Sequence, residues 1–176
     1  MLFDFFYIVL ELKKTPRKGW KEKIDVLHPE SVADHSFSAA VMAMIFSDLK
    51  KLDTEKMLKM ALLHDLSESI TGDFTPEEVS KNNKKEIKNQ AMTEILSRLP
   101  TEISYKYVKI WNEFQEGTSK ESILMHEIDR LEMAIQSLKY NAEGHSKEKL
   151  ATFFESAKKD IKSKEILEIL DEISYK

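Results

Sequence analysis

The sequence contains no cysteine, and glycine and proline are scarce, with four of each in 176 residues. The first absence excludes a disulfide framework, a cysteine zinc site and an iron–sulfur cluster, and it fits a reducing compartment. The second leaves few residues that favour tight turns. We therefore expect a cytoplasmic protein built of long regular elements rather than many short strands.

The sequence also lacks a basic excess and a long apolar run. Its 27 Lys and Arg face 31 Asp and Glu, a formal net charge of −4, whereas a nucleic-acid-binding domain usually carries a basic excess. The longest wholly apolar run, residues 39–46, is too short to cross a bilayer. Residues 1–12 contain Asp4 and Glu11 and no basic leader, unlike a secretory signal. We expect neither a nucleic-acid polymer nor a membrane as partner.

Apolar residues instead recur at helical spacing along almost the whole chain. In the predicted helix over residues 32–50, for example, Phe37, Val41, Met44 and Ile45 recur every three or four positions and define an apolar face. The pattern predicts an all-α, single-domain helical bundle over residues 1–176. Its motifs lie within about 14–140, and C-terminal helices from 146 to 176 pack on that part.

Capping residues place the helix boundaries. Further helices are predicted over 3–13, from 54 to 71, from the start signal Thr75-Pro76-Glu77-Glu78, over 101–116, from 120 to 143 and from 147 onward. The polar stretch 80–85 is a predicted weak point, the last helical region is predicted to split near Lys162, and residues 14–31 are expected to form a loop. The expected N-caps are Ser31, Thr54, Ser119 and Ser146, and Gly117 is an expected stop.

Two histidines, His35 and His64, lie in the middle of predicted helices with apolar neighbours. A lone histidine in such a position is more often a satisfied core residue than a metal ligand. His64 is followed directly by Asp65, and adjacent helical residues point about 100° apart, so both can reach one ion lying between them. Burying such a pair is costly unless each member is paired or coordinates an ion. The pair therefore favours a metal site.

A further ligand should be a carboxylate from a distant helix. Asp129 is the best candidate because Ile128 and Leu131 flank it, while Glu127 and Glu132 compete from positions expected to be more solvated. Taken alone, this aspartate would be interpreted as a partner of the neighbouring arginine. Two imidazoles and two carboxylates suit Mn²⁺, Co²⁺, Fe²⁺, Ni²⁺ or Zn²⁺ better than Mg²⁺ or Ca²⁺.

The order histidine, histidine–aspartate pair, distant aspartate resembles the pattern of the HD-domain phosphohydrolase superfamily. Residues 29–36 (PESVADHS) and 64–73 (HDLSESITGD) are similar to motifs of one subgroup, the HD-type 5′-nucleotidases that act on deoxynucleoside monophosphates. The resemblance covers roughly residues 1–140. It implies a homodimeric enzyme that uses a divalent metal, held by the four residues above, to hydrolyse nucleoside 5′-monophosphates to nucleoside and phosphate.

Two acidic residues are candidates for catalysis. Glu68 follows His64 by four positions and overhangs the same helical face, and the resemblance also points to it as the general acid/base. Asp73, in the loop that follows, is the second candidate, and the family suggests that it fixes the nucleophile or the sugar. The alternative for Glu68 is a solvated carboxylate at a helix end.

The segment Pro16-Arg17-Lys18-Gly19-Trp20 resembles a segment that supplies substrate contacts in the subgroup. Arg17 can bind a phosphate bidentately, and Trp20 offers a flat face for a base or sugar. Six basic residues face one acid over residues 13–23, which suggests an anion funnel. The alternatives are a solvated basic loop and a tryptophan that fills the core.

Two other functions remain open from the sequence. An HD enzyme could act on a cyclic nucleotide, guanosine tetraphosphate or a nucleoside triphosphate, and an HD fold could serve as a non-catalytic binding module. The retention of Glu68 and Asp73 beside the predicted ligands argues against the second. The apolar start of the chain, residues 2–7, could form either a dimer interface or part of the core.

Overall fold

The structure is a computed structural model that describes residues 2–75 and 81–173. Within these residues it is helical apart from turns and loops, with one isolated bridge between Pro16 and Ser31 and no strand. The predicted all-α class is confirmed. In chain order the elements are α1 (Leu2–Glu11), the 3₁₀ turn η1 (Leu12–Lys14), α2 (Lys18–Ile24), α3 (Val32–Lys50), α4 (Thr54–Leu63), α5 (Glu68–Thr71), α6 (Lys81–Leu96), α7 (Thr101–Glu116), α8 (Lys120–Ala142), α9 (Lys147–Asp160) and α10 (Lys164–Ile173).

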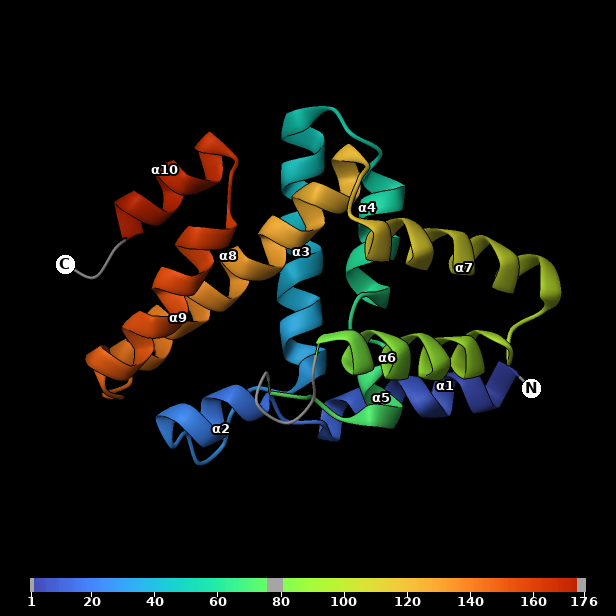
Figure 1. Cartoon of the computed structure of the whole chain (residues 1–176), viewed down its shortest axis with the longest axis horizontal. Coiled ribbons are helices and arrows are strands. Elements are labelled where there is room, and N and C mark those ends of the chain that lie inside the picture. Colours follow the sequence, from blue (N-terminus) through green and yellow to red (C-terminus); the bar gives the residue numbers. More distant parts are fainter. Residues whose placement is uncertain (1, 76–80, 174–176) are drawn as a thin grey trace.

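Three helices, α3, α4 and α8, form the centre of the bundle. α3 and α4 pack side by side, and α8 crosses them (Figure 1). α9 folds back along α8, and α10 packs against the same helix. α7 packs on α4 and α8, and α6 lies between α7 and the layer of α1 and α5. Residues far apart in sequence on α3, α4 and α8 can therefore meet at one place.

α3 buries its small side chains and exposes its large apolar ones. Ala39, Ala40 and Ala43 are buried where α4 and α8 pack on this helix. The predicted apolar face lies on the surface instead, with Phe37 70% exposed. α3 is apolar on two faces, and the alanine face packs inward because small side chains let neighbouring helix axes approach closely. The periodicity finds both faces but cannot choose between them.

Most predicted boundaries match the structure. The predicted N-caps Ser31, Ser119 and Ser146 each accept a hydrogen bond from a backbone N–H three residues on, and Gly117 ends α7 with a left-handed φ of 65°. The predicted cap Thr54 is wrong by one position. Asp53 caps α4, since its carboxylate accepts from the Lys56 N–H, and aspartate is the stronger N-cap of the two.

The prediction of a loop over residues 14–31 missed α2. This helix buries Trp20 and Ile24, and its N-terminus is capped from a distant part of the chain. The Lys18 backbone N–H donates to the Asp73 carboxylate at 2.9 Å. A short segment with glycine and no local cap carries a weak helical signal, because the residue that caps it is contributed by the tertiary fold.

The predicted helix over residues 54–71 is divided in two. α4 ends at Leu63, and four residues of turn separate it from α5. The predicted start at Thr75-Pro76-Glu77-Glu78 falls in a stretch of which only Thr75 is described. From Lys81 onward α6 is continuous to Leu96, so the polar residues 81–85 do not interrupt it.

The predicted split near Lys162 separates α9 from α10. The Glu127 carboxylate accepts hydrogen bonds from the backbone N–H groups of Lys162 and Ser163 at 2.7 and 2.9 Å, which fixes the break. The inner faces of both helices join the same core cluster as α8. None of the helices in the described part of the chain is long and apolar enough to cross a membrane.

Candidate metal centre

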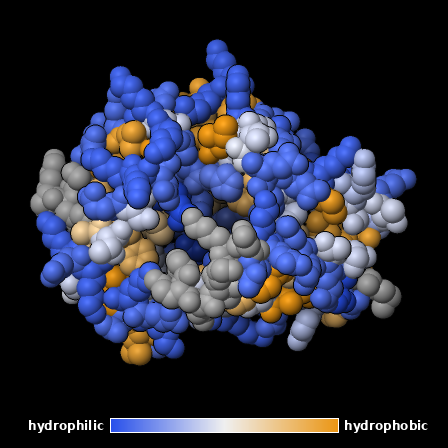
Figure 2. Space-filling view, in the orientation of Figure 1, coloured by the Kyte–Doolittle hydropathy of each residue, from blue (hydrophilic) through white to orange (hydrophobic). Residues whose placement is uncertain are grey.

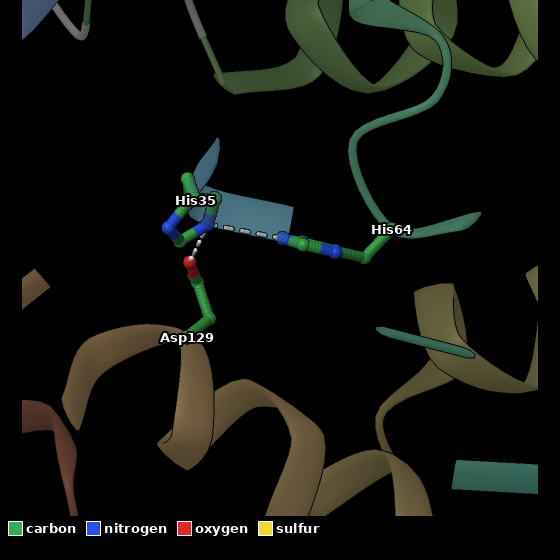
Figure 3. A group of neighbouring side chains, drawn as sticks. All are labelled: His35, His64 and Asp129. Atoms are coloured by element: carbon green, nitrogen blue, oxygen red, sulfur yellow. Dashed lines mark hydrogen bonds and ion pairs between the residues drawn. The ribbon is translucent and has the colours of Figure 1, made fainter. Parts of the chain in front are cut away.

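Three side chains from distant parts of the chain point toward one another: His35 from α3, His64 from the turn after α4, and Asp129 from α8 (Figure 3). His35 Nε2 lies 3.2 Å from His64 Nε2 and 3.1 Å from Asp129 Oδ1. Asp65 Oδ2 lies 3.4 Å from His64 Nε2 and 3.8 Å from His35 Nε2. The structure thus brings all four predicted ligands together.

The turn after α4 directs the side chains of His64 and Asp65 toward His35. Here the prediction of a continuous helix is wrong, and the backbone instead forms successive i→i+3 bonds, from Leu66 N–H to Leu63 O at 3.1 Å and from Glu68 N–H to Asp65 O at 2.9 Å. Such a tightened turn rotates successive side chains differently from an α-helix. Both side chains of the pair reach the same side of the turn, close to His35.

The outer nitrogen of each imidazole is already engaged. His35 Nδ1 lies 2.5 Å from Glu132 Oε2, and His64 Nδ1 lies 2.6 Å from the Ala61 carbonyl oxygen. Neither acceptor carries a proton in its usual state, so the imidazole N–H groups donate. With both Nδ1 atoms engaged, the Nε2 atoms of the two rings face each other, as in histidines that bind metals.

Converging lone pairs attract a cation. The ligand atoms of His35, His64 and Asp129 lie within 4.8 Å of one another, a set of two nitrogens and an oxygen that fits a divalent transition-metal ion. A proton competes for the same place. Burial and Arg17 act to lower the pKa of His35, but hydrogen bonds to Asp129 and Glu132 outweigh them and raise it to about 10.

Burial and neighbouring charges also shift the pKa values of His64 and Asp129. Burial lowers the pKa of His64. Burial would raise the pKa of Asp129, but the hydrogen bond and charge of His35 hold it well below its usual range. At neutral pH the cluster therefore contains an ionised carboxylate, a neutral imidazole at His64 and a proton that a metal ion would displace from His35.

Glu68 lies beside this cluster and is not a solvated helix-end carboxylate. It is 2% exposed, and its Oε1 accepts from the Lys88 ammonium at 2.7 Å. Its Oε2 is buried and has no hydrogen-bond partner within the described residues. Burial, reinforced by the charge of Asp65, raises the pKa of Glu68 to about 8. A carboxyl group with these properties can exchange a proton near neutral pH.

A cavity of about 450 Å³ opens next to the cluster. The face drawn in Figure 2 is hollowed near its centre, and the visible walls of the hollow are hydrophilic. Arg17 connects the cavity with the cluster, because it lines the former and its Nη1 lies 3.5 Å from Asp65 Oδ2. Asp73 lines the cavity as well. The remaining lining residues are Gly19, Trp20, Lys23, Phe74, Thr75, Lys84, Arg130, Met133, Thr152, Phe153 and Ser156.

Trp20 lies in the core as well as at the cavity wall. It is 2% exposed, stacks on Phe153 with ring centroids 4.4 Å apart, and its indole N–H donates to Glu30 Oε1 at 2.8 Å. The structure therefore agrees with the alternative interpretation, in which this tryptophan fills the core. Trp20 also lines the cavity, and its contact with substrate stays a prediction.

Glu127 and Glu132, the alternatives to Asp129 as metal ligand, each bind another part of the protein. Both were expected to be solvated, and both are buried, at 6% and 3% exposure for Glu127 and Glu132. Glu127 accepts two backbone N–H groups at the break between α9 and α10, and Glu132 holds His35. The expectation was wrong because partners supplied by other helices compensate the cost of burying these carboxylates.

Sequence reasoning missed several residues of the site. Lys88 contacts both Asp65 and Glu68, and Lys84, one helical turn earlier, lines the cavity. Their i,i+4 spacing places them on one face of α6, which was an available signal. Arg130 and Phe153 also line the cavity, and nothing in their local sequence indicates it.

Several curated proteins that are similar to this chain are named 5′-deoxynucleotidase. The 5′-deoxynucleotidase HDDC2 of Dictyostelium discoideum is 36% identical over 166 residues, covering 88% of this chain and 87% of that protein. The human 5′-deoxynucleotidase HDDC2 is 32% identical over 173 residues, covering 98% of this chain and 84% of that protein. Each spans nearly the whole of the present fold.

A solved structure of a conserved hypothetical protein from Pyrococcus furiosus matches with a TM-score of 0.80 at 32% identity, covering 97% of each chain. The HD domain family model matches residues 9–170, a range that includes α9 and most of α10, in which the sequence shows no motif. This chain belongs to the HD domain family.

Proposed function

We propose that this protein is a metal-dependent phosphohydrolase that converts 5′-nucleoside monophosphates, in particular deoxynucleoside monophosphates, to nucleoside and phosphate. The observation that carries the proposal is the convergence of two Nε2 lone pairs and a carboxylate beside a cavity rich in basic residues. The relatives named 5′-deoxynucleotidase support the substrate class.

His35, His64, Asp65 and Asp129 would hold one divalent ion of the Mn²⁺, Co²⁺, Ni²⁺, Fe²⁺ or Zn²⁺ type. Three of them offer ligand atoms in one group, and Asp65 Oδ2 borders that group. Two carboxylates balance the charge of a divalent ion in this buried setting. When bound, the ion supplies Lewis acidity to the attacking water and the phosphoryl oxygen.

Glu68 is the proposed general acid/base. Its buried Oε2 can accept a proton from the attacking water, as the bond from phosphorus to the sugar 5′ oxygen breaks, and can return a proton to that departing oxygen. Arg17 can bind a phosphoryl oxygen from the cavity wall. Asp73, on the same wall, is placed to orient the sugar or the nucleophile.

We further propose that the protein is a homodimer that uses the exposed face of α3. Five apolar side chains form one stripe along that helix: Phe37, Val41, Met44, Ile45 and Leu49. The stripe is about 18 Å long, since residues 37 and 49 are twelve positions apart. A continuous apolar stripe is uncommon on a monomer, and one helix crossing its own copy gives the self-complementary contact that two-fold symmetry needs.

The substrate class is tested by measuring phosphate release from a panel of ribo- and deoxynucleoside monophosphates with Mn²⁺ or Co²⁺ present. We expect turnover on monophosphates, loss of activity with a chelator, and recovery on adding metal. Cyclic nucleotides, guanosine tetraphosphate and nucleoside triphosphates belong in the same panel. Activity on these alone would identify a different HD hydrolase, and inactivity on the whole panel would favour a binding module.

Replacing Glu68 with Gln removes the proton acceptor at nearly constant shape. We expect kcat to fall by about 10²- to 10⁴-fold, the usual contribution of a general base, with metal content and fold unchanged. Glu102→Gln, on the exposed face of α7, is the control and should keep the parental kcat. An unchanged kcat in Glu68→Gln would move the role of base to another residue, with Asp73 the next to test.

Metal binding should release protons. His35, with its pKa raised to about 10, holds a proton at pH 7.5 that the ion must displace. We therefore expect release of about one proton per ion and an affinity that rises with pH until about pH 10. Calorimetric titration of Mn²⁺ or Zn²⁺ in buffers of different ionisation enthalpy measures this release. Asp65→Ala should abolish loading and exposed Asp171→Ala should not, so loaded Asp65→Ala would contradict the ligand assignment.

The dimer proposal is tested by light scattering after size-exclusion chromatography. The unmodified protein should elute with the mass of two chains, and the double variant Phe37→Asp, Ile45→Asp with the mass of one, because two buried charges oppose an apolar contact. Leu27→Asp is a matched control, since Leu27 is 76% exposed and lies outside the stripe. A monomeric parent protein would exclude the α3 interface.

A further inference from the structure

One lysine on α6 contacts two acidic groups of the site at once. The Lys88 ammonium lies 2.9 Å from Asp65 Oδ1 and 2.7 Å from Glu68 Oε1. Its side chain is 15% exposed, so the contact is largely shielded from water. An ammonium that is mostly shielded from water and lies between two buried carboxylates interacts strongly with them, because solvent screens the charges little.

The bridge divides the two oxygens of Asp65 between two tasks. Oδ1 accepts from Lys88, and Oδ2 faces the Nε2 atoms of His35 and His64 at 3.8 and 3.4 Å, with Arg17 Nη1 at 3.5 Å on its other side. The aspartate side chain cannot turn Oδ2 away without breaking its contact with the lysine. The lysine thus fixes which oxygen is offered to the proposed metal.

The same division holds for Glu68. Oε1 contacts Lys88, whereas Oε2 is buried and has no hydrogen-bond partner in the part of the chain that the structure describes. Leaving a buried carboxylate oxygen unpaired costs free energy. The contact of Oε1 with Lys88 keeps Oε2 in this position. Burial and the charge of Asp65 favour the protonated form of Glu68, and the Lys88 ammonium opposes them by favouring its ionised form.

Lys88 is itself held in place by its helix. The next residue, Asn89, accepts a hydrogen bond from the Trp111 indole N–H of α7 at 3.0 Å. One turn earlier, Lys84 donates to the Phe74 carbonyl at 2.6 Å. These contacts tie α6 to α7 and to the loop after α5. The position of the ammonium relative to both carboxylates is therefore set by the fold.

We propose that Lys88 is a positioning residue of the reaction: it holds Asp65 and Glu68 by one oxygen each and so directs Asp65 Oδ2 to the metal and Glu68 Oε2 to the nucleophilic water. Lys88 is absent from the residues that line the cavity, unlike Arg17 and Lys84. Its ammonium contacts Asp65 and Glu68, so the role proposed for it runs through these two acids. This inference rests on the proposed function and assigns a residue to it.

The test compares Lys88→Met, which keeps the apolar stem and removes the charge, with Lys88→Arg and with Lys85→Met, an exposed lysine of the same helix. Steady-state kinetics gives kcat and KM, calorimetry gives Mn²⁺ affinity, and circular dichroism reports the fold. In Lys88→Met we expect kcat to fall about 10²-fold with KM nearly unchanged, and Mn²⁺ affinity to fall about 10- to 100-fold. Lys88→Arg should lie between this variant and the parent, and Lys85→Met should match the parent.

Several results would overturn the proposal. Parental kcat and Mn²⁺ affinity in folded Lys88→Met would show that the bridge is dispensable, and a rise in KM alone would make Lys88 a substrate contact. Where Lys88→Met does not fold, Lys88→Arg decides, since it keeps the charge but presents a planar fork. A parental kcat in that variant would mark a purely structural ion pair, and a lowered kcat at parental KM would support positioning.

The proposed function can fail separately from this inference. If the unmodified protein releases no phosphate from any monophosphate, the proposed activity is wrong. The Mn²⁺ affinity of Lys88→Met is then the measurement that tests the role of Lys88. Unchanged affinity in Lys88→Met would overturn its role toward Asp65, and a weakened affinity would support it.

Discussion

The site depends on one constraint: ionisable groups buried at the centre of a helical bundle must each find a partner. His35, fully buried on α3, is the group on which the others converge. Glu132 contacts its outer nitrogen, and His64 and Asp129 face its inner one. An unpaired charge at this depth would cost several kcal/mol, so the cluster, as well as apolar packing, holds α3, α8 and the turn after α4 in register.

The packing of α3 makes that cluster possible. Its buried face consists of alanine and other small residues, so α4 and α8 approach closely enough for side chains of ordinary length to meet at His35. The large apolar side chains of the same helix, from Phe37 to Leu49, are left on the outer surface. One helix thereby combines a tightly packed interior face beside the site with the exposed apolar face on which the proposed dimer rests.

The fold class and most helix ends were predictable because they rest on local signals, whereas the choice of Asp129 as a candidate ligand rested mostly on the family resemblance. Ser31 and Gly117 act within a few residues of themselves, and the adjacency of His64 and Asp65 is visible in the sequence. The parts that were missed depend on contacts between distant residues. Asp73 caps α2 from another segment, and Glu127 of α8 accepts from the backbone at the end of α9. The core alternative that the sequence left open for Trp20 was settled by a distant residue, Phe153. The solvated positions expected for Glu127 and Glu132 were wrong for the same reason. The choice between two apolar faces of α3 was likewise settled by its neighbours.

A common rule organises the site. Each of four groups has two polar atoms, and in each case one of them is fixed by the protein: His35 Nδ1 by Glu132, His64 Nδ1 by the Ala61 carbonyl, and Asp65 Oδ1 and Glu68 Oε1 by Lys88. The second atom of each is left for chemistry. A side chain fixed at one atom keeps its other atom in a defined place, so little reorganisation is needed when a cation or substrate arrives. The hydrogen bonds that hold His35 also raise its pKa, whereas the raised pKa of Glu68 comes from burial and the charge of Asp65 and is opposed by its contact with Lys88.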